Sequence, residues 1–233
     1  MRIFIDPDAL APGELAVRGD EHHYVAHVRR ARPGDTVELV DGAGHRAPAT
    51  IVRISEDETI LHAGPLELIA AALPFVRALV PLIKGDRMEL CIEKLVEVGV
   101  DAIVIWRAAR SVTRLDDARL GSRIARYQAI AQAAARQSGR AQVPRITSAD
   151  DLTSALAGLP DGERLVLDPT SDAELDIPAA TDITIISGPE GGLAPDELDR
   201  LAGFTSAGLG PRILRAETAP MIAVALIRAA TRS

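Results

Sequence analysis

The sequence holds a single cysteine, Cys91, among its 233 residues. One cysteine cannot form an internal disulfide, and such scarcity is typical of proteins that work in a reducing cytoplasm. Cys91 falls within an amphipathic segment that predicts a helix. We therefore interpret it as a small core residue and not as a reactive thiol.

Long apolar runs are also missing. The longest, Leu68–Val76, is too short and too interrupted to span a bilayer. Asp6 and Asp8 interrupt any apolar stretch near the N-terminus, so we expect no signal peptide. Because 47 % apolar and 25 % charged residues are ordinary for globular chains, we expect a cytoplasmic globular protein without a membrane partner.

The common phosphate-binding and metal-binding motifs are absent. There is no G-K-[ST] loop, and the one prominent glycine loop comes late and does not read G-x-G-x-x-G. His22, His23 and His27 lie close together, but neither a cysteine partner nor an H-E-x-x-H pattern accompanies them. We expect no metal site and interpret these histidines as packing residues or as contacts to a binding partner.

The net charge of −7 is unevenly distributed along the chain. Residues 1–75 hold seven arginines against twelve acids, a balance of −5. Residues 76–145 hold thirteen basic residues against seven acids, or +6, and residues 146–233 hold six against fourteen, or −8. A basic centre between acidic flanks fits a face that binds a polyanion, but it fits a set of solvated helix faces equally well.

The first part of the chain is rich in predicted strands. The short apolar runs at 2–5, 36–40 and 49–54 predict strands, and Asp41-Gly42 predicts a tight turn between two of them. A helix is expected over residues 20–28, with Asp20 as its cap. Short strands, tight turns and little helix favour a small barrel that ends near Pro74.

From Phe75 onward, strands and helices alternate, which predicts an α/β domain. Strands are expected at 75–83, 100–106, 164–167, 183–186 and 204–207. Helices are expected at 86–98, 116–137, 150–157, 195–201 and 217–230, with Gly99 ending the first and Asp116 and Asp117 beginning the second.

Two segments near the C-terminus suggest the two halves of one pocket. Residues 183–192 form an apolar run that breaks into the glycine loop Gly188-Pro-Glu-Gly-Gly, and residues 209–219 combine Gly, Pro, two arginines and Glu217. Ligands of parallel α/β sheets gather at the C-terminal ends of strands. Glu190 would repel a pyrophosphate, so a nucleoside-like ligand without phosphate is preferred; a glycine turn that merely joins strand to helix is the alternative.

These two segments resemble the trefoil-knotted (SPOUT-type) RNA methyltransferases, and within them the 16S rRNA uridine-N3 methyltransferase family. Residues 84–100 resemble the first strand–helix unit of that family, and residues 110–111 and 126–144 its middle section. Residues 22–34 and 41–44 resemble its N-terminal RNA-binding barrel. The resemblance therefore covers most of the chain.

The resemblance implies a trefoil-knotted, parallel-sheet α/β methyltransferase domain at 73–233, preceded by a small PUA-like β-barrel RNA-binding domain at 1–72. It implies S-adenosylmethionine as the cofactor and a homodimer, for which Ala223, Val224, Leu226 and Ile227 of the last helix are interface candidates. Around the cofactor it places Leu167, Gly188, Pro189, Glu190, Gly191, Leu209, Gly210, Ile213 and Leu214.

The implied reaction is methyl transfer to N3 of a uridine in 16S rRNA of the small ribosomal subunit. Uracil N3–H is a weak acid, so a catalyst must remove its proton or stabilise the developing anion. Arg215 is the candidate for stabilisation, with a structural ion pair to Glu217 or Glu190 as the alternative. Either Glu190 or Glu217 is a candidate base.

A set of basic residues is expected to contact RNA phosphates or bases: Arg30, Lys84, Arg87, Arg110, Arg136 and Arg140. Arg29 and Arg136 stand where this family usually has a leucine and a glutamate, and the second change adds a cation near the expected RNA cleft. A methyltransferase that acts on another RNA is an alternative, and two other classes stay open. One is an RNA-binding protein that has lost catalysis, and the other is a nucleotide-dependent enzyme.

Overall fold

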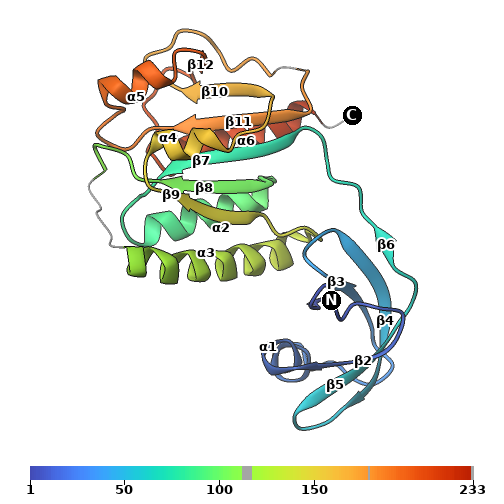
Figure 1. The fold of residues 1–233 in the computed structure, drawn as a ribbon. Helices are drawn as coiled ribbons and strands as arrows, with labels where there is room; N and C mark the ends of the chain where they lie inside the picture. The colour runs from blue at the N-terminus through green and yellow to red at the C-terminus, as the bar shows by residue number, and fades with distance from the viewer. Residues whose placement is uncertain (112–116, 178, 232–233) are drawn as a thin grey trace. The chain divides into compact units, whose positions relative to one another are not determined.

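The computed structural model describes residues 1–111, 117–177 and 179–231. The chain forms two compact units (Figure 1). The first comprises Met1–Ala71 with Ala135–Val143, and the second comprises Ala72–Ala134 with Pro144–Ser233. The sequence did not predict that residues 135–143 belong with the N-terminal part of the chain.

The first unit is built on a six-stranded sheet in the order β1-β3-β4-β5-β2, with β6 paired to β4. The β1–β3 pair is parallel and the other strand pairs are antiparallel. The strands are β1 (Arg2–Phe4), β2 (Gly13–Arg18), β3 (Thr36–Val40), β4 (His45–Ile54), β5 (Glu58–Ala63) and β6 (Glu67–Leu68). The three predicted strands and the turn after Asp41 are confirmed, whereas β2, β5 and β6 were not predicted.

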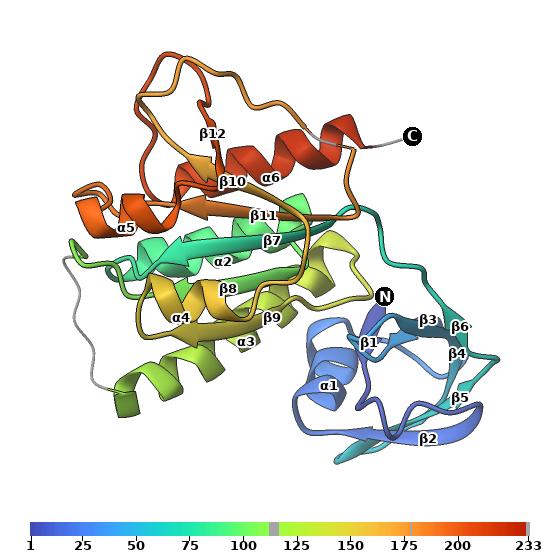
Figure 2. The same ribbon diagram turned by 45° about the horizontal axis from the view of Figure 1, so that its top comes forward.

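This sheet curls around one apolar core (Figure 2). Strands β1 to β5 each contribute a buried side chain to that core, in chain order Ile3, Val17, Leu39, Ile51 and Leu61. Alternate residues of a strand point to the same face, so one face of each strand is apolar and the other is polar. The arrangement agrees with the barrel-like unit that the sequence predicts.

The helical segment of the first unit differs from its prediction. A short α1 (Gly19–His23) continues as a π-helix over Tyr24–Val28. Asp20 is not the cap: Arg18 occupies the N-cap position and makes no side-chain capping bond, while Asp20 lies inside the first turn. His22 is buried and hydrogen-bonds to the Thr59 hydroxyl at 2.9 Å, so its role is structural.

The second unit is built on a parallel six-stranded sheet in the order β12-β10-β11-β7-β8-β9. Its strands are β7 (Phe75–Pro81), β8 (Ala102–Trp106), β9 (Arg145–Ala149), β10 (Glu163–Leu167), β11 (Asp182–Ser187) and β12 (Thr205–Ala207). Its helices are α2 (Asp86–Val98), α3 (Asp117–Ser138), α4 (Leu152–Ala157), α5 (Pro195–Arg200) and α6 (Thr218–Ala230). Residues 135–138 at the end of α3 belong to the first unit.

The predicted alternation of strands and helices is confirmed, and β9 is the strand that was not predicted. Asp116, expected at the start of the long helix, lies outside the described residues. Within the described part of the chain, no helix is long and apolar enough to cross a membrane.

The sequence of α2 explains where this helix begins and ends. Gly85 precedes it with φ +66°, and Gly99 ends it in the left-handed region at φ +108°, donating its N–H to the carbonyl of Leu95. The face between these glycines is buried, including Cys91. Burial raises the pKa of the Cys91 thiol to about 12, with a further contribution from the negative charge of Glu217, so this thiol stays protonated at neutral pH.

Helices cover both faces of the parallel sheet. On one face Trp106 and Ile186 share a core with Leu152 of α4 and Leu201 after α5. On the other face α2 packs against α6, and α6 packs against β7 and β11. Since neighbouring strand residues point to opposite faces, Ser187 points to the α6 side.

The connection that follows β12 passes directly against the connection that follows β10. The N–H of Gly208 donates to the carbonyl of Ala173 at 2.7 Å, and Glu174 forms a parallel bridge with Gly208. A Cβ atom on Gly208 would lie 2.5 Å from the carbonyl oxygen of Ser171. Only glycine fits at this crossing.

Replacing Gly208 with alanine is expected to destabilise the second unit, because the added methyl group meets backbone oxygens that cannot move without displacing the crossing. We expect the free energy of unfolding to fall by about 2 kcal/mol or more, measured by urea unfolding. Gly203→Ala is the matched control, since a Cβ there meets nothing within 4 Å, and should change stability by less than about 0.5 kcal/mol. Equal midpoints for the two variants would contradict this account of the crossing.

Candidate active site

Three strands of the second unit end at the same level, so their loops begin side by side. Leu167, the last residue of β10, pairs in register with Ser187 at the end of β11 and with Ala207 at the end of β12. The glycine loop follows Ser187, and the segment 208–217 follows Ala207. The two sequence segments predicted to form one pocket therefore leave the same edge of the sheet.

Close backbone packing explains the glycines of the loop at 188–192. A Cβ on Gly191 would lie 3.2 Å from the Cβ of Arg110 and 3.3 Å from its carbonyl oxygen. Gly192 adopts φ +72° and donates its N–H to the carbonyl of Pro189 at 2.9 Å, which closes a tight turn. The loop is thus pressed against the segment that follows β8.

Glu197 joins these two loops, a role that the sequence did not assign. One of its carboxylate oxygens accepts the N–H of Ala194 at 2.7 Å, and the other accepts the N–H of Ala109 at 2.8 Å. The side chain is buried. Its position three residues after Ala194 at the start of α5, as in a capping box, was the signal available in the sequence.

Arg110, expected to contact RNA, donates hydrogen bonds to the glycine loop. Its guanidinium nitrogen Nη1 lies 3.3 Å from the carbonyl oxygen of Gly191 and 3.1 Å from that of Leu193. These bonds hold the loop from the β8 side.

A second arginine lies between the two predicted catalytic carboxylates. Arg87 forms an ion pair with Glu190 at 2.8 Å and a longer one with Glu217 at 3.6 Å. Arg215 lies 4.0 Å from Glu217, and its side chain is 75 % exposed. A structural ion pair with Glu217 or Glu190 was the alternative role for Arg215. In the structure, Arg87 makes the closer ion pairs with both carboxylates.

Glu217 is the buried acid of this group. It is 5 % exposed, and its Oε2 atom makes no hydrogen bond. The hydroxyl of Ser187, on the face of the sheet that α6 covers, is buried and also lacks a hydrogen-bond partner. Buried polar atoms are normally satisfied; Oε2 of Glu217 lies 3.6 Å from the Arg87 guanidinium, and the Ser187 hydroxyl is open to a further polar partner.

The apolar residues predicted to surround a ligand lie on the segment 208–217. Ile213 is 84 % exposed, and Leu209 and Leu214 are half-buried. Gly210 has φ +99°, which turns the backbone at this point. An isoleucine this exposed gains free energy when a ligand covers it.

The remaining predicted RNA contacts are distributed over both units. Lys84, just before α2, and Arg30, with φ +50° in the first unit, are exposed. Arg140 lies in the segment 135–143, and its N–H donates to the carbonyl of Ala135.

Arg136 belongs to the packing of the first unit. Its guanidinium lies over the rings of Tyr24 and Phe4, with its carbon 4.8 Å and 5.4 Å from the two ring centres. It also forms an ion pair with Glu21, a residue of α1. Burial raises the pKa of the Glu21 carboxyl above its ordinary value, and the charge of Arg136 offsets only part of this shift.

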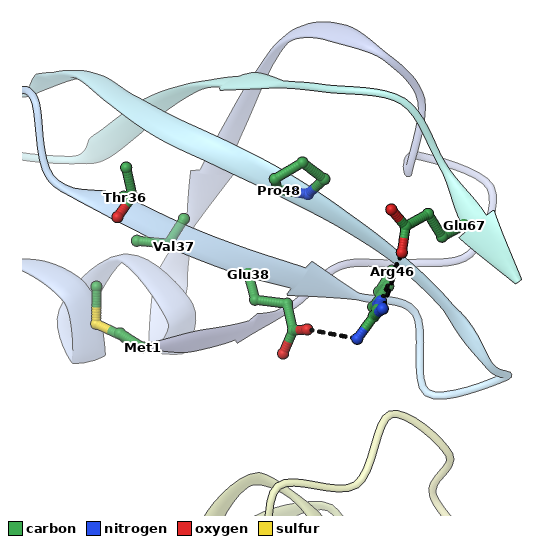
Figure 3. A pocket seen from close by; sticks show the side chains of 7 residues that line it. All are labelled: Met1, Thr36, Val37, Glu38, Arg46, Pro48 and Glu67. Atoms are coloured by element: carbon green, nitrogen blue, oxygen red, sulfur yellow. Dashed lines mark hydrogen bonds and ion pairs between the residues drawn. The ribbon is translucent and has the colours of Figure 1, made fainter. Parts of the chain in front are cut away.

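A cavity of about 460 Å³ lies on the first unit, over the paired strands β3 and β4 (Figure 3). Its charged groups neutralise one another, because Arg46 pairs with Glu67 at 2.9 Å and with Glu38 at 3.6 Å. None of the predicted cofactor residues lines it. Among the residues that the structure describes, no group of three or more His, Cys, Asp or Glu could hold a metal ion.

The sequence matches two family models. Residues 72–228 match an RNA methyltransferase domain, and residues 17–61 match an RNA methyltransferase PUA domain. Ribosomal RNA small subunit methyltransferase E of Mycobacterium bovis is 34 % identical, over 97 % of this chain and 90 % of that protein. The chain belongs to this methyltransferase family. The relative of the same name from Bacillus subtilis is 32 % identical, over 91 % of this chain and 89 % of its own length.

Two solved structures support the fold of the family. Ribosomal RNA small subunit methyltransferase E of Neisseria gonorrhoeae, bound to S-adenosyl methionine, is 30 % identical with a TM-score of 0.84, covering 98 % of this chain and 97 % of its own. A methyltransferase of Legionella pneumophila in complex with the same cofactor is 26 % identical with a TM-score of 0.86 and the same coverage. The predicted fold class, a knotted parallel-sheet α/β domain with a PUA-like domain, is confirmed.

Arg136→Met is expected to lower the free energy of unfolding by roughly 2 kcal/mol at pH 7.5, because Glu21 would stay buried without its partner. The raised pKa of Glu21 stabilises the protein below pH 4.5, and this contribution is lost as the pH rises through the folded-state value. Without Arg136 that pKa rises further, so the effect of the substitution should be smaller at pH 4 than at pH 7.5 in urea unfolding.

The matched control is Arg18→Met, which breaks an ion pair with Glu58 in which the arginine is exposed, and should cost less than about 1 kcal/mol. A loss on Arg136→Met that does not depend on pH, or that persists unchanged in a Glu21→Gln background, would contradict the pairing.

Proposed function

We propose that this protein transfers a methyl group from S-adenosylmethionine to N3 of a uridine in 16S rRNA. The observation that carries the proposal is the alignment of three strand ends, with Leu167 paired to both Ser187 and Ala207. Ligands of parallel α/β sheets bind at such edges. The cofactor bound to the Neisseria gonorrhoeae relative supports the same assignment here.

The residues at this edge fit a nucleoside-like ligand. The glycine loop offers backbone groups, and exposed Ile213 with Leu214 offers an apolar surface for an adenine ring. We assign the cofactor to the predicted set of Leu167, Gly188, Pro189, Glu190, Gly191, Leu209, Gly210, Ile213 and Leu214. When bound, S-adenosylmethionine supplies the electrophilic methyl group.

The protein must handle the proton on uracil N3. The guanidinium of Arg215 is exposed and only distantly paired, so it is available to donate hydrogen bonds to the anion that develops over O2, N3 and O4. Glu190 and Glu217 remain the candidate bases. Both carboxylates lie at this edge of the sheet, and both are paired with Arg87.

The RNA must present an unpaired base, since N3 takes part in base pairing. Lys84, Arg30, Arg110, Arg136 and Arg140 remain the proposed RNA contacts, and Arg110 and Arg136 also bind groups of the protein itself. Arg87, the sixth predicted contact, pairs with Glu190 and Glu217. An rRNA or small-subunit substrate would place the protein in the cytoplasm.

We also propose a homodimer. Of the four interface candidates on α6, Ala223, Val224 and Ile227 are fully buried in the core of this chain, while Leu226 is 44 % exposed. Leu226, with Ile222 and Leu90, is therefore the part of α2 and α6 that a second copy can cover. Sedimentation equilibrium of the protein tests this proposal, and a monomer at micromolar concentration would contradict it.

Two measurements test the function. Calorimetry should show S-adenosylmethionine binding and no tighter binding of NAD or ATP, which separates the proposal from a nucleotide-dependent enzyme. Mass mapping of ribosomal RNA from cells with and without the gene should show one 16S uridine that loses a methyl group. An RNA-binding protein without catalysis would leave the modification pattern unchanged.

Arg215→Ala is expected to lower kcat by about 10²-fold or more while the Kd of S-adenosylmethionine stays near the wild-type value, because its guanidinium acts on the anion that forms during transfer. Single-turnover methylation of small-subunit RNA measures the rate. Arg164→Ala is the control, as this arginine lies over Phe204 near β12 and should leave the rate unchanged. Equal rates for Arg215→Ala and the wild type would remove Arg215 from catalysis.

A further inference from the structure

Arg87 connects the two segments that line the proposed pocket. Its Nη2 atom lies 2.8 Å from Oε1 of Glu190, in the glycine loop after β11. Its Nη1 atom lies 3.6 Å from Oε2 of Glu217, the residue that precedes α6. One guanidinium, fixed in the first turn of α2, thus contacts both halves of the site.

The chemistry of the guanidinium suits this connection. It carries donors in a planar fork and keeps its charge at every physiological pH, so it can face two carboxylates at once. A lysine ammonium is a compact point charge on a flexible stem and does not reproduce this geometry.

Burial of Glu217 makes its ion pair important. The carboxylate is 5 % exposed, and a buried charge is costly unless it is paired. Arg87 approaches it more closely than Arg215 does, at 3.6 Å against 4.0 Å. Arg87 is therefore the main compensation for this buried carboxylate.

The packing of α2 against α6 agrees with these contacts. Cys91 follows Arg87 by four residues, so both side chains lie on one side of α2. Cys91 is fully buried, and the charge of Glu217 adds to the raised pKa of its thiol. The start of α6 therefore lies against the face of α2 that Arg87 and Cys91 share.

We propose that Arg87 is a positioning residue of the cofactor site and not an RNA contact. By pairing with Glu190 and Glu217 it holds the glycine loop and the segment before α6 at a fixed separation, so that the pocket between them is formed before the ligand arrives. This assignment rests on the proposed function, since it takes these two segments to be the walls of the S-adenosylmethionine site.

The test separates binding of the cofactor from binding of RNA. Arg87→Met is expected to raise the Kd of S-adenosylmethionine about tenfold in calorimetry, because the loops must be ordered by the ligand itself. The affinity for small-subunit RNA, and its dependence on salt, should stay at wild-type values. Arg87→Lys should give an intermediate cofactor affinity.

Arg126→Met is the matched control. Arg126 pairs with Glu89 of the same helix α2 at 2.8 Å, but its side chain is exposed and touches no predicted site residue. It should leave the Kd of S-adenosylmethionine unchanged. If Arg87→Met lowers the unfolding midpoint, the double variant Arg87→Met/Glu217→Gln removes the unpaired charge and restores the midpoint, yet it should still bind the cofactor about tenfold more weakly.

Three results would overturn the assignment. Wild-type cofactor affinity in folded Arg87→Met would show that Arg87 does not position the pocket. Arg87 would be an RNA contact if Arg87→Met bound RNA more weakly at unchanged cofactor affinity. The slope of log affinity against log salt concentration would then fall by about one, the value of a single phosphate contact. Absence of S-adenosylmethionine binding by the wild-type protein itself would instead overturn the proposed function on which the assignment rests.

Discussion

The close passage of Gly208 under the carbonyl oxygens of Ser171 and Ala173 is the contact on which the second unit depends. It fixes the course of the chain just after β12, at the level where β10 and β11 also end. The glycine loop and the segment before α6 therefore leave the sheet as neighbours, although residues 193–207, with helix α5 and strand β12, separate them in sequence. A parallel sheet alone aligns strand ends, and the crossing adds a restraint on the loops that leave those ends.

Within that frame, charged groups hold the loops in place. Glu197 satisfies two backbone N–H groups from separate loops, and Arg110 satisfies two carbonyl groups of the glycine loop. Such bonds join flexible connections to rigid elements, which is how a site on loops keeps its geometry. Arg110, a residue of the basic centre, thus also contributes to the architecture of the site.

Helices and strands with a strong apolar periodicity could be predicted from the sequence, and those with a weak one could not. Helix α2 has the predicted bounds because an apolar stripe lies between two glycines. Strands β9 and β2 were missed because both lie at sheet edges and carry few large apolar residues. The two segments of the proposed pocket were recognised through their glycines. The partners of Arg110 and Arg136, in contrast, lie 81 and 115 positions away along the chain. Local patterns carry no information about such pairs.

Because residues 135–143 belong to the first unit, the chain cannot be truncated or recombined at residue 72 without breaking that unit. The first unit is discontinuous, so a cut or a recombination event near residue 72 would part Glu21 from Arg136 and leave a buried acid and two aromatic rings without their cation. Residues 1–72 therefore cannot be exchanged between proteins as an independent domain. A substitution in either segment has to be accommodated by the other, so the two are constrained to change together.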